Sequence, residues 1–385
     1  MRIITTTGDL DTFVAELEHG PYAAIDTEFM RDQTYWPKLC LVQAAGPENQ
    51  AIIDPLTPGI ELDPFYRLLG NPAVVKVFHA ARQDIEIFHH QGGVIPEPFF
   101  DTQIAAMVCG FGESASYETL VRKLAKADID KSARFTDWSR RPLSKRQLDY
   151  ALSDVTHLRQ LYQILSGELS KTGRTTWVEE EEATLMNPAT YRLDPAEAWR
   201  RLKPRSGNKR FLAVLAGVAA WREREAQSRD VPRNRVLRDE TLLEIAAHPP
   251  VDADHLDHIR GLPNGYAQSR AGKSLMAAIQ ESLTATPPEL APAGPRLRRE
   301  PSPAALDLLK TLLRLRATEF RVAPRLVADM ADLERLACGE TEGVAALHGW
   351  RANVFGDDAL ALCAGRLAIS LDDGEAVILE TPTLS

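Results

Sequence analysis

The sequence predicts an α/β domain with a mixed sheet, followed by two all-helical modules. Three observations lead to this fold class: short apolar strands near the start, helical spacing of apolar residues from about Thr102 onward, and two later segments that resemble each other. A chain of 385 residues is too long for one ordinary domain and suits two or three.

The first part of the chain contains four short apolar segments that read as strands. They are residues 23–29, 39–45, 51–54 and 74–80. The fourth continues into a helix expected over 82–90. Helical spacing then dominates residues 101–111, 116–126 and 144–169. Strands followed by helices predict a mixed sheet with helices packed on its faces.

The second half contains two segments that resemble each other. Residues 237–247 align with 327–337, and Trp221, Arg222 and Pro232 align with Leu313, Arg314 and Pro324. The shared order of helix, proline and Asp-started helix predicts two similar helical modules. Residues 366–380 depart from this pattern and predict a hairpin around Asp373-Gly374.

These patterns predict five consecutive parts of the chain. They are an α/β domain over 1–170, a helical linker over 171–206, a first helical module over 207–285, a proline-rich linker over 286–302 and a second, divergent module over 303–385.

Composition excludes several classes of protein. No run of about 18 apolar residues exists, so neither a transmembrane helix nor a membrane partner is expected. The first residues lack the basic and apolar regions of a secretory signal. The four cysteines are far apart, which argues against a disulfide framework or a zinc–thiolate site and favours a reduced, cytoplasmic setting.

The charge of the chain is segregated, although its net value is −9. Residues 192–238 carry 13 bases and 5 acids, and residues 122–146 carry nine bases and three acids. Local basic patches are compatible with binding a polyanion, and equally with a solvated charged surface.

Four acids and a tyrosine stand out on three predicted elements. Asp26 and Glu28 are two apart on a strand and share a face, Asp84 lies where a strand gives way to a helix, and Tyr150 and Asp154 share a helix face. Each feature alone fits a solvent-facing strand end, an ordinary first-turn aspartate or a buried tyrosine beside a surface acid. Together they predict a phosphodiesterase site with two Mg²⁺ or Mn²⁺ ions held by carboxylate oxygens.

The same residues resemble the motifs of a known family. Residues 24–43, 78–88 and 130–158 are similar to the three motifs of the DEDDy 3′–5′ exonucleases and, within them, of the ribonuclease D family. The position five residues before Asp154 is Asp149, which favours the tyrosine branch over the histidine branch of these enzymes. The two helical modules resemble HRDC domains, although Leu313 replaces the tryptophan in the second.

The resemblance implies a ribonuclease H-like exonuclease domain and a 3′–5′ exoribonuclease that releases nucleoside 5′-monophosphates. It also implies transfer-RNA precursors as substrates and a monomer. Asp26 would hold both ions, Glu28 and Asp154 the ion that carries the attacking water, and Asp84 the second ion. A tyrosine titrates near 10, so Tyr150 is expected to position the water rather than act as a base.

Two further predictions concern RNA binding. The basic residues expected to bind phosphates, together with the first helical module, are Arg201, Lys203, Arg205, Lys209 and Arg210. Phe29, Tyr35 and Trp36 could stack on terminal bases, but burial explains Tyr35 and Trp36 equally well.

Two alternatives remain open at this stage. One is a DNA 3′–5′ exonuclease of the same superfamily, because the phosphodiester is common to both nucleic acids. The other is a catalytically inactive nucleic-acid-binding protein. A solubilising role for the basic stretch is also open.

Overall fold

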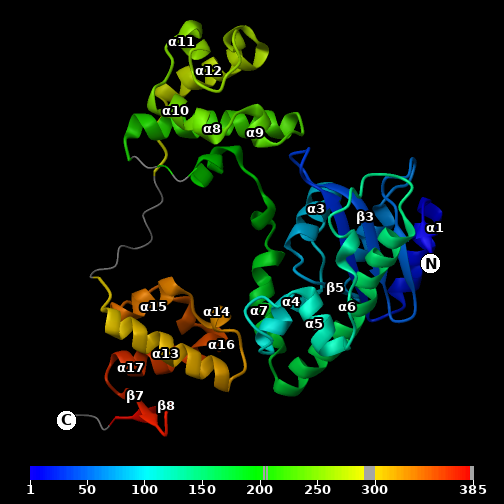
Figure 1. The fold of residues 1–385 in the computed structure, drawn as a ribbon, viewed down its shortest axis with the longest axis vertical. Helices are drawn as coiled ribbons and strands as arrows, with labels where there is room; N and C mark the ends of the chain where they lie inside the picture. Colours follow the sequence, from blue (N-terminus) through cyan, green and yellow to red (C-terminus); the bar gives the residue numbers. More distant parts are fainter. Residues whose placement is uncertain (203, 205–206, 290–299, 382–385) are drawn as a thin grey trace.

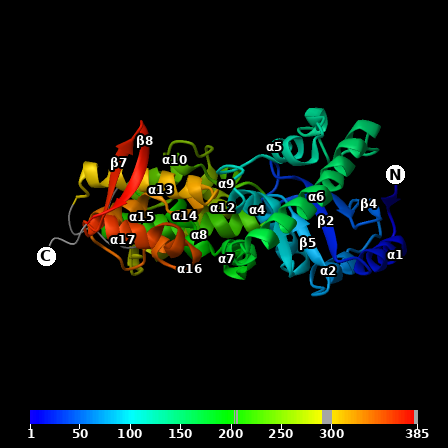
Figure 2. The ribbon, with the colours of Figure 1, turned by 90° about the horizontal axis from the view of Figure 1, so that it is seen from below.

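The computed structural model describes residues 1–202, 204, 207–289 and 300–381. It contains an α/β domain and two helical modules, which lie on the same side of that domain (Figures 1 and 2). Each has a hydrophobic core of its own. The predicted mixed α/β domain followed by a helical module is therefore confirmed.

A six-stranded mixed sheet forms the centre of the α/β domain, with the order β1-β4-β3-β2-β5-β6. Its strands are β1 (Ile3–Ile4), β2 (Tyr22–Met30), β3 (Lys38–Ala45), β4 (Gln50–Ile53), β5 (Val75–Phe78) and β6 (Phe99–Asp101). β3 is antiparallel to β2 and β4, whereas β5 is parallel to β2 and β6. β1 and β6 were not predicted, because two or three residues are too short to show an alternating pattern.

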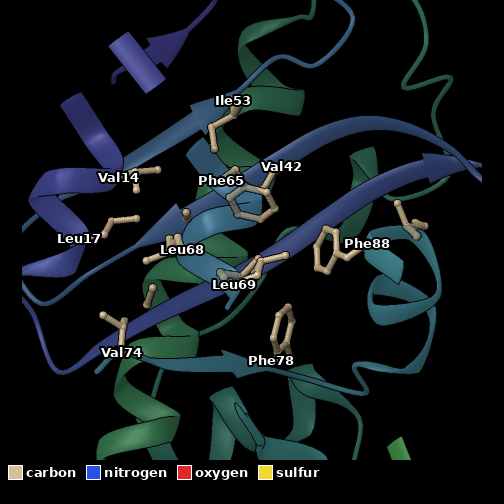
Figure 3. Packing of buried hydrophobic residues seen from close by; sticks show 14 of the residues in the cluster. Val14, Leu17, Val42, Ile53, Phe65, Leu68, Leu69, Val74, Phe78 and Phe88 are labelled. Carbon is tan, nitrogen blue, oxygen red and sulfur yellow. The ribbon is translucent and has the colours of Figure 1, made fainter. Parts of the chain in front are cut away.

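Helices cover both faces of this sheet. They are α1 (Thr7–Glu18), α2 (Asp63–Leu69), α3 (Arg82–Gly92), α4 (Thr102–Val108), α5 (Tyr117–Leu120) and α6 (Lys145–Thr172). Residues of α1, α2 and α3 pack on one face in the largest core cluster, in which Phe65, Phe78 and Phe88 lie close together (Figure 3). α6 crosses the opposite face, where its Val155 and Leu158 meet Ala24 of β2.

The alternation of β2 determines where its acids point. Ala23 and Ile25 belong to the core on the α1–α3 face, whereas Ala24 packs against α6. Because side chains two apart in a strand share a face, Asp26 lies on the same face as Ala24, toward α6. The fold therefore presents a carboxylate of β2 to the helix that carries Asp154.

The segment predicted as a helical linker is helical, but part of it packs into the α/β domain. It forms α7 (Thr175–Met186) and the 3₁₀ segments η3 (Pro188–Tyr191) and η4 (Pro195–Leu202). Glu182 of α7 is buried and accepts a hydrogen bond of 2.6 Å from the Asp101 backbone N–H, and Tyr191 joins the main core. A cut at Lys171 would therefore expose the α/β core.

The two helical modules begin with the same order of elements. The first contains α8 (Lys209–Ser228), α9 (Arg233–Val236), α10 (Asp239–Ala247), α11 (Ala253–Asp257) and α12 (Arg270–Thr284). The second contains α13 (Pro303–Glu319), α14 (Pro324–Val327), α15 (Met330–Ala337), α16 (Gly349–Arg351) and α17 (Asp357–Cys363). In both, a long helix is followed by a short helix at a proline and then by a helix with an aspartate at its start, which is the first residue of α10 (Asp239) and the N-cap of α15 (Asp329).

The predicted hairpin is present at the end of the second module. β7 (Leu367–Asp372) pairs antiparallel with β8 (Glu375–Glu380). Asp373 and Gly374 both have positive φ, as a two-residue hairpin turn of the favoured type requires. Among the described residues, none of the helices has the length and apolar character needed to span a membrane.

The second module docks on the α/β domain beside α4 and α7. Trp350 stacks on Trp177 with ring centroids 4.5 Å apart, and the Ala323 N–H donates to the Met107 carbonyl at 2.9 Å. Gly110 has φ of 79° in this contact, and a Cβ there would lie 2.5 Å from the backbone oxygen of Arg321. The contact therefore requires glycine for two separate reasons.

We predict that Gly110→Ala weakens this docking. The substitution adds left-handed backbone strain and a clash with backbone that cannot move alone, so it should lower the free energy of unfolding. Gly173→Ala is the matched control, because Gly173 has φ of 68° and no atom within 4 Å of its Cβ position. In urea titrations, Gly110→Ala should cost about 1–3 kcal/mol more than Gly173→Ala. Equal losses would contradict the close approach.

Candidate active site

Two neighbouring carboxylates come from β2. Asp26 and Glu28 lie on this strand, opposite Gln43 and Leu41 of β3, and a bulge follows at Glu28/Phe29. A ligand oxygen from each lies within 4.8 Å of one from Asp154, so the three form a group that could hold a metal ion. The structure thus brings together residues that are more than 120 positions apart in the chain.

Asp84 approaches the same group from the first turn of α3. Its side chain is buried and accepts a hydrogen bond from the Thr27 hydroxyl, between the two acids of β2. The turn before α3 is held by Asp101, whose carboxylate accepts hydrogen bonds of 2.9 Å from the N–H groups of Ala80 and Ala81. Asp101 therefore fixes the backbone that leads into α3, three and four residues before Asp84.

α6 supplies the last acid and the tyrosine. A capping box between Ser144 and Gln147 starts this helix, and Tyr150 and Asp154 follow on one face. The segment before the helix is fixed to β4, because Arg141 forms a bidentate ion pair of 2.6 and 2.7 Å with Asp54. The capping box and this ion pair fix where α6 begins relative to the sheet, and therefore where Tyr150 and Asp154 lie.

A cavity of about 300 Å³ opens at the acids. Asp26, Tyr150 and Asp154 line it, and so do the cations Lys131, which pairs with Glu118, and Arg134. Its other lining residues are His79, Ala80, Gln103, Ser116, Tyr117, Glu118, Ile129 and Leu158. The cavity therefore joins an acidic wall to two cations, as a site for a metal-bound phosphodiester would need.

The acids raise one another's pKa. Burial, and then repulsion from Asp26, Asp154 and Asp84, raises the pKa of Glu28 to about 10. Burial raises the pKa of Asp26 to about 6, and burial together with Asp26 raises that of Asp154 to about 8. The pKa of Asp84 is also raised, by burial and by Asp26. Such a cluster destabilises its own charged form unless a cation neutralises it.

The chemistry of these donors fits a hard divalent cation. Carboxylate oxygens are the ligands that Mg²⁺ and Mn²⁺ prefer, and several converge here without a full set of cationic side chains to balance them. Arg134 lowers the pKa of Glu28 and Asp154, but it is exposed and does not pair with either in the described structure.

The Tyr150 hydroxyl is placed to donate a hydrogen bond rather than to lose its proton. Burial and the charge of Asp154 raise the pKa of its hydroxyl well above the ordinary value, so it stays protonated. Its ring lies 6.0 Å from that of Trp138, which is buried. The structure is consistent with the prediction that this hydroxyl acts by hydrogen bonding.

Sequence analysis missed two residues of this cavity. The Tyr117 hydroxyl donates to the Asp154 backbone carbonyl, which fixes the turn of α6 that carries the acid. Arg134 lies within the basic stretch 122–146, which the sequence identified only as a charge excess. The excess of basic residues in this stretch could have indicated Arg134. No local sequence pattern indicates a role for Tyr117.

The aromatic residues Phe29, Tyr35 and Trp36 do not line the cavity. Tyr35 is 6% exposed, and its hydroxyl donates to Glu223 of the first helical module and accepts from Arg233 at 2.9 Å. Trp36 stacks on His90, with ring centroids 3.7 Å apart. Phe29 packs against the main core. Base stacking by Tyr35 is therefore wrong, and the alternative of burial is correct for it, because this loop docks the first module.

The predicted phosphate-binding residues divide into two groups. Arg201, Lys209 and Arg210 are exposed on η4 and at the start of α8. Lys203 and Arg205 lie outside the described residues. The exposure of the first group is compatible with a role in binding but does not identify one.

Comparisons with known proteins define the class. Residues 1–170 match a family described as 3′-5′ exonuclease, and residues 211–279 match the HRDC domain. The divalent-metal dependence of this exonuclease family agrees with the acid cluster. The fold and the comparisons thus define a 3′–5′ exonuclease with an HRDC domain.

Full-length relatives make the assignment more specific. Ribonuclease D of Granulibacter bethesdensis is 50% identical over 382 residues, covering 98% of this chain and 96% of its own. Ribonuclease D of Nitrobacter hamburgensis is 47% identical and covers 99% of this chain and 100% of its own. The chain belongs to the ribonuclease D family and is a 3′–5′ exoribonuclease.

A solved structure agrees over nearly the whole chain. The crystal structure of Escherichia coli RNase D, described as an exoribonuclease involved in structured RNA processing, superposes with a TM-score of 0.78 and 29% identity. The match covers 94% of this chain and 98% of that one. The family model for HRDC matches the first helical module alone, so the second predicted HRDC domain is not established by these comparisons.

The burial of Asp26 predicts an effect on stability. Because the pKa of Asp26 is raised, its carboxylate costs stability above its unfolded pKa near 4, and the full cost is present above pH 6. Asp26→Asn should therefore stabilise the metal-free protein by about 1–3 kcal/mol at pH 8, and this gain should largely vanish near pH 4.5. Urea unfolding in EDTA at both pH values measures it.

Asp149→Asn provides the control for this experiment. Asp149 is exposed on the same helix as Asp154 and pairs with Lys145 at 3.2 Å. Its substitution should change stability by less than about 0.5 kcal/mol at either pH. A destabilised Asp26→Asn variant at pH 8 would show that the cluster is not under electrostatic strain.

Proposed function

We propose that the cavity at β2, α3 and α6 is the site where this exoribonuclease hydrolyses the 3′-terminal phosphodiester and releases nucleoside 5′-monophosphates. The observation that carries the proposal is the convergence of acids from three elements, whose pKa values are all raised. The proposed catalytic residues are Asp26, Glu28, Asp84, Tyr150 and Asp154, as in the DEDDy pattern.

Each acid has a proposed task. Asp26 would hold both of two divalent ions, Mg²⁺ or Mn²⁺, because it lies between the other acids and influences the pKa of each of them. Glu28 and Asp154 would complete one ion site, and Asp84 would complete the other. When bound, such ions supply an activated water and stabilise charge on the leaving oxygen.

The remaining polar groups act on the substrate and the water. Tyr150 would donate a hydrogen bond that orients the attacking water. Lys131 and Arg134, which line the same cavity, would bind the phosphate and keep it beside the acids. The Asp101 carboxylate, bound to the turn before α3, would keep Asp84 in position.

The proposal also covers the RNA substrate, the oligomeric state and the cellular compartment, as the sequence predicts them. We infer that the protein matures the 3′ ends of transfer-RNA precursors, acts as a monomer and works in the cytoplasm. All four cysteines lie in described residues and form no disulfide, which supports a reduced compartment. The exposure of Arg201, Lys209 and Arg210 supports a role in binding RNA phosphates beyond the active site. The proposed set also includes Lys203 and Arg205, which the sequence analysis predicted to bind phosphates.

We also propose that the second module is a divergent HRDC domain. The matching order of α8–α10 and α13–α15 supports a shared origin. Leu313 occupies the place of Trp221, and both are buried in their own cores. The proposed boundaries are 1–170, 171–206, 207–285, 286–302 and 303–385, with α7 and η3 packed on the exonuclease domain.

The direct test of the proposed function uses RNA and DNA oligomers of equal sequence. The protein is incubated with each in Mg²⁺, Mn²⁺ or EDTA, and the products are separated. Nucleoside 5′-monophosphates should appear from the 3′ end of RNA, and EDTA should abolish them. Products carrying a 3′-phosphate, or full activity in EDTA, would contradict the proposed chemistry. Faster cleavage of DNA would favour the DNA exonuclease alternative.

The role of Tyr150 predicts a specific kinetic pattern. Tyr150→Phe removes only the hydroxyl, so kcat should fall by roughly 10²-fold or more while KM changes little. Tyr162→Phe is the matched control, since Tyr162 lies on the same helix and packs against Tyr22 and Phe100 instead of the acids. It should retain near-normal kcat. A large rise in KM with preserved kcat would assign Tyr150 to substrate binding.

A further inference from the structure

An arginine-lined cleft lies where the exonuclease domain meets the first helical module. Two adjoining cavities of about 320 and 350 Å³ share Arg31, Tyr35, Arg201 and Arg233 in their walls. Across both, the lining includes five arginines and two carboxylates: Arg31, Arg82, Arg201, Arg222, Arg233, Glu86 and Asp239. The cleft is thus cationic on a chain whose net charge is −9.

The cleft is assembled from three separate parts of the chain. Arg31 follows β2, Arg82 begins α3, and Arg201 lies on η4 between the domains. The opposite wall comes from α8 and α9 of the first module. α9 lies beside the loop that joins β2 and β3 (Figure 1). No single segment of the sequence could therefore show it.

Tyr35 fixes the two walls relative to each other. Its backbone N–H and that of Trp36 both donate to the Asp230 carboxylate at 3.0 Å. Its hydroxyl accepts from Gln227 at 3.2 Å, and the Arg233 guanidinium lies over its ring at 4.6 Å from the centroid. This buried tyrosine holds the arginines of both domains around one space.

The arginines are only partly neutralised. Arg31 pairs with Glu86 at 2.6 Å, Arg222 with Asp239 at 2.5 Å, and Arg233 with the buried Glu223. Within the described residues, Arg82 and Arg201 have no ion-pair partner, and both are exposed. Two guanidinium groups therefore remain available to an anion.

A buried donor gives a second, independent indication of a ligand. Arg222 is 4% exposed and lines the cleft, yet its Nε has no hydrogen-bond partner in the described structure. Its Nη1 is bound to the Leu237 carbonyl and Asp239. An unsatisfied buried guanidinium N–H is costly, and a phosphate oxygen reached through a small shift would satisfy it.

The cleft shares two elements of the chain with the acids of the active site, β2 with the loop after it and α3. Arg31 is three residues beyond Glu28, roughly 10 Å along an extended strand. Arg82 is two residues before Asp84 in the first turn of α3, a rise of roughly 3 Å along the helix, and its exposed side chain points to another side of the helix than the buried Asp84. An RNA chain whose 3′ end lies at the acids, and which leaves past these two residues, would bring its upstream phosphates to the arginines.

We propose that this cleft is a second binding site, for backbone phosphates of the RNA a few nucleotides upstream of the 3′ end. The proposal rests on the proposed function, because it places the RNA 3′ end at the acid cluster. Guanidinium groups bind phosphate oxygens in bidentate fashion, and several converge here. The site spans the joint between the domains, so long RNA would bind the exonuclease domain and the first module at once.

The experiment compares two RNA substrates of different length. An RNA dinucleotide occupies only the acid cluster, whereas a 12-nucleotide single-stranded RNA also reaches the cleft. The test variant is R82Q/R201Q, which removes the two arginines without ion pairs. The control is R224Q/R314Q, which removes two exposed arginines outside the cleft and changes the net charge equally. Kinetics are measured with Mg²⁺ over a range of salt concentrations.

The proposal predicts a loss confined to the longer RNA. For R82Q/R201Q, KM on the 12-nucleotide RNA should rise roughly 10-fold, and the salt slope should fall by about 1.4, or about 0.7 for each lost phosphate contact. Its kinetics on the dinucleotide, and those of R224Q/R314Q on both substrates, should match wild type. R82K/R201K keeps both charges and should retain most of the slope.

Three results would overturn the inference. A test variant that matches its control on both RNAs shows that the cleft does not bind the chain. An equal loss on the dinucleotide assigns these arginines to the active site itself. Inorganic phosphate that raises the melting temperature of wild type but not of R82Q/R201Q, without any dependence on RNA length, identifies a small-anion site instead. Wild type that cleaves neither RNA contradicts the proposed function rather than the cleft alone.

Discussion

The burial of four neighbouring carboxylates is the constraint on which the site depends. Asp26, Glu28, Asp84 and Asp154 are held together although their pKa values show that the charged forms are disfavoured. The surrounding fold must supply the free energy that keeps them in place. A large core on one face of the sheet and a 28-residue helix on the other do so.

Several contacts outside the cavity help to hold the acids in place. Glu182 of α7 binds the backbone of Asp101, Asp101 binds the turn before α3, and that turn carries Asp84. Burial raises the pKa of Glu182 to about 9. The segment between the domains is therefore a support of the active site as well as a connection. β2 has a similar double role, because it carries two acids and leads directly into the loop that docks the first module through Tyr35.

Local sequence patterns were sufficient for the main elements and for the acids. Alternation placed Asp26 and Glu28 on one strand face, and helical spacing placed Tyr150 and Asp154 together. The position of Tyr35 could not be predicted, because its partners in the first module lie nearly 200 residues away. An aromatic residue carries the same local signal whether it meets a base or another domain. The packing of α7 was missed for the same reason, since a polar, acidic helix resembles a linker.

The two helical modules show what local sequence patterns predict and what they do not. The order of helix, proline and aspartate predicted two modules, and the structure contains that order twice. The modules nevertheless dock differently: the first through Tyr35 in the loop between β2 and β3, the second through Trp350, which stacks on Trp177 of α7. Shared local structure thus does not determine shared contacts, which depend on the residues exposed on each surface.

Anomalous diffraction from crystals grown with Mn²⁺ tests the central claim most directly. The account predicts two anomalous peaks among the carboxylates of Asp26, Glu28, Asp84 and Asp154, with Asp26 bound to both, and loss of both peaks in Asp26→Asn crystals. Two ions 3.5–4 Å apart, as a rough expectation, would fit the proposed reaction. Manganese bound elsewhere, with this cluster lacking any peak, would contradict the account.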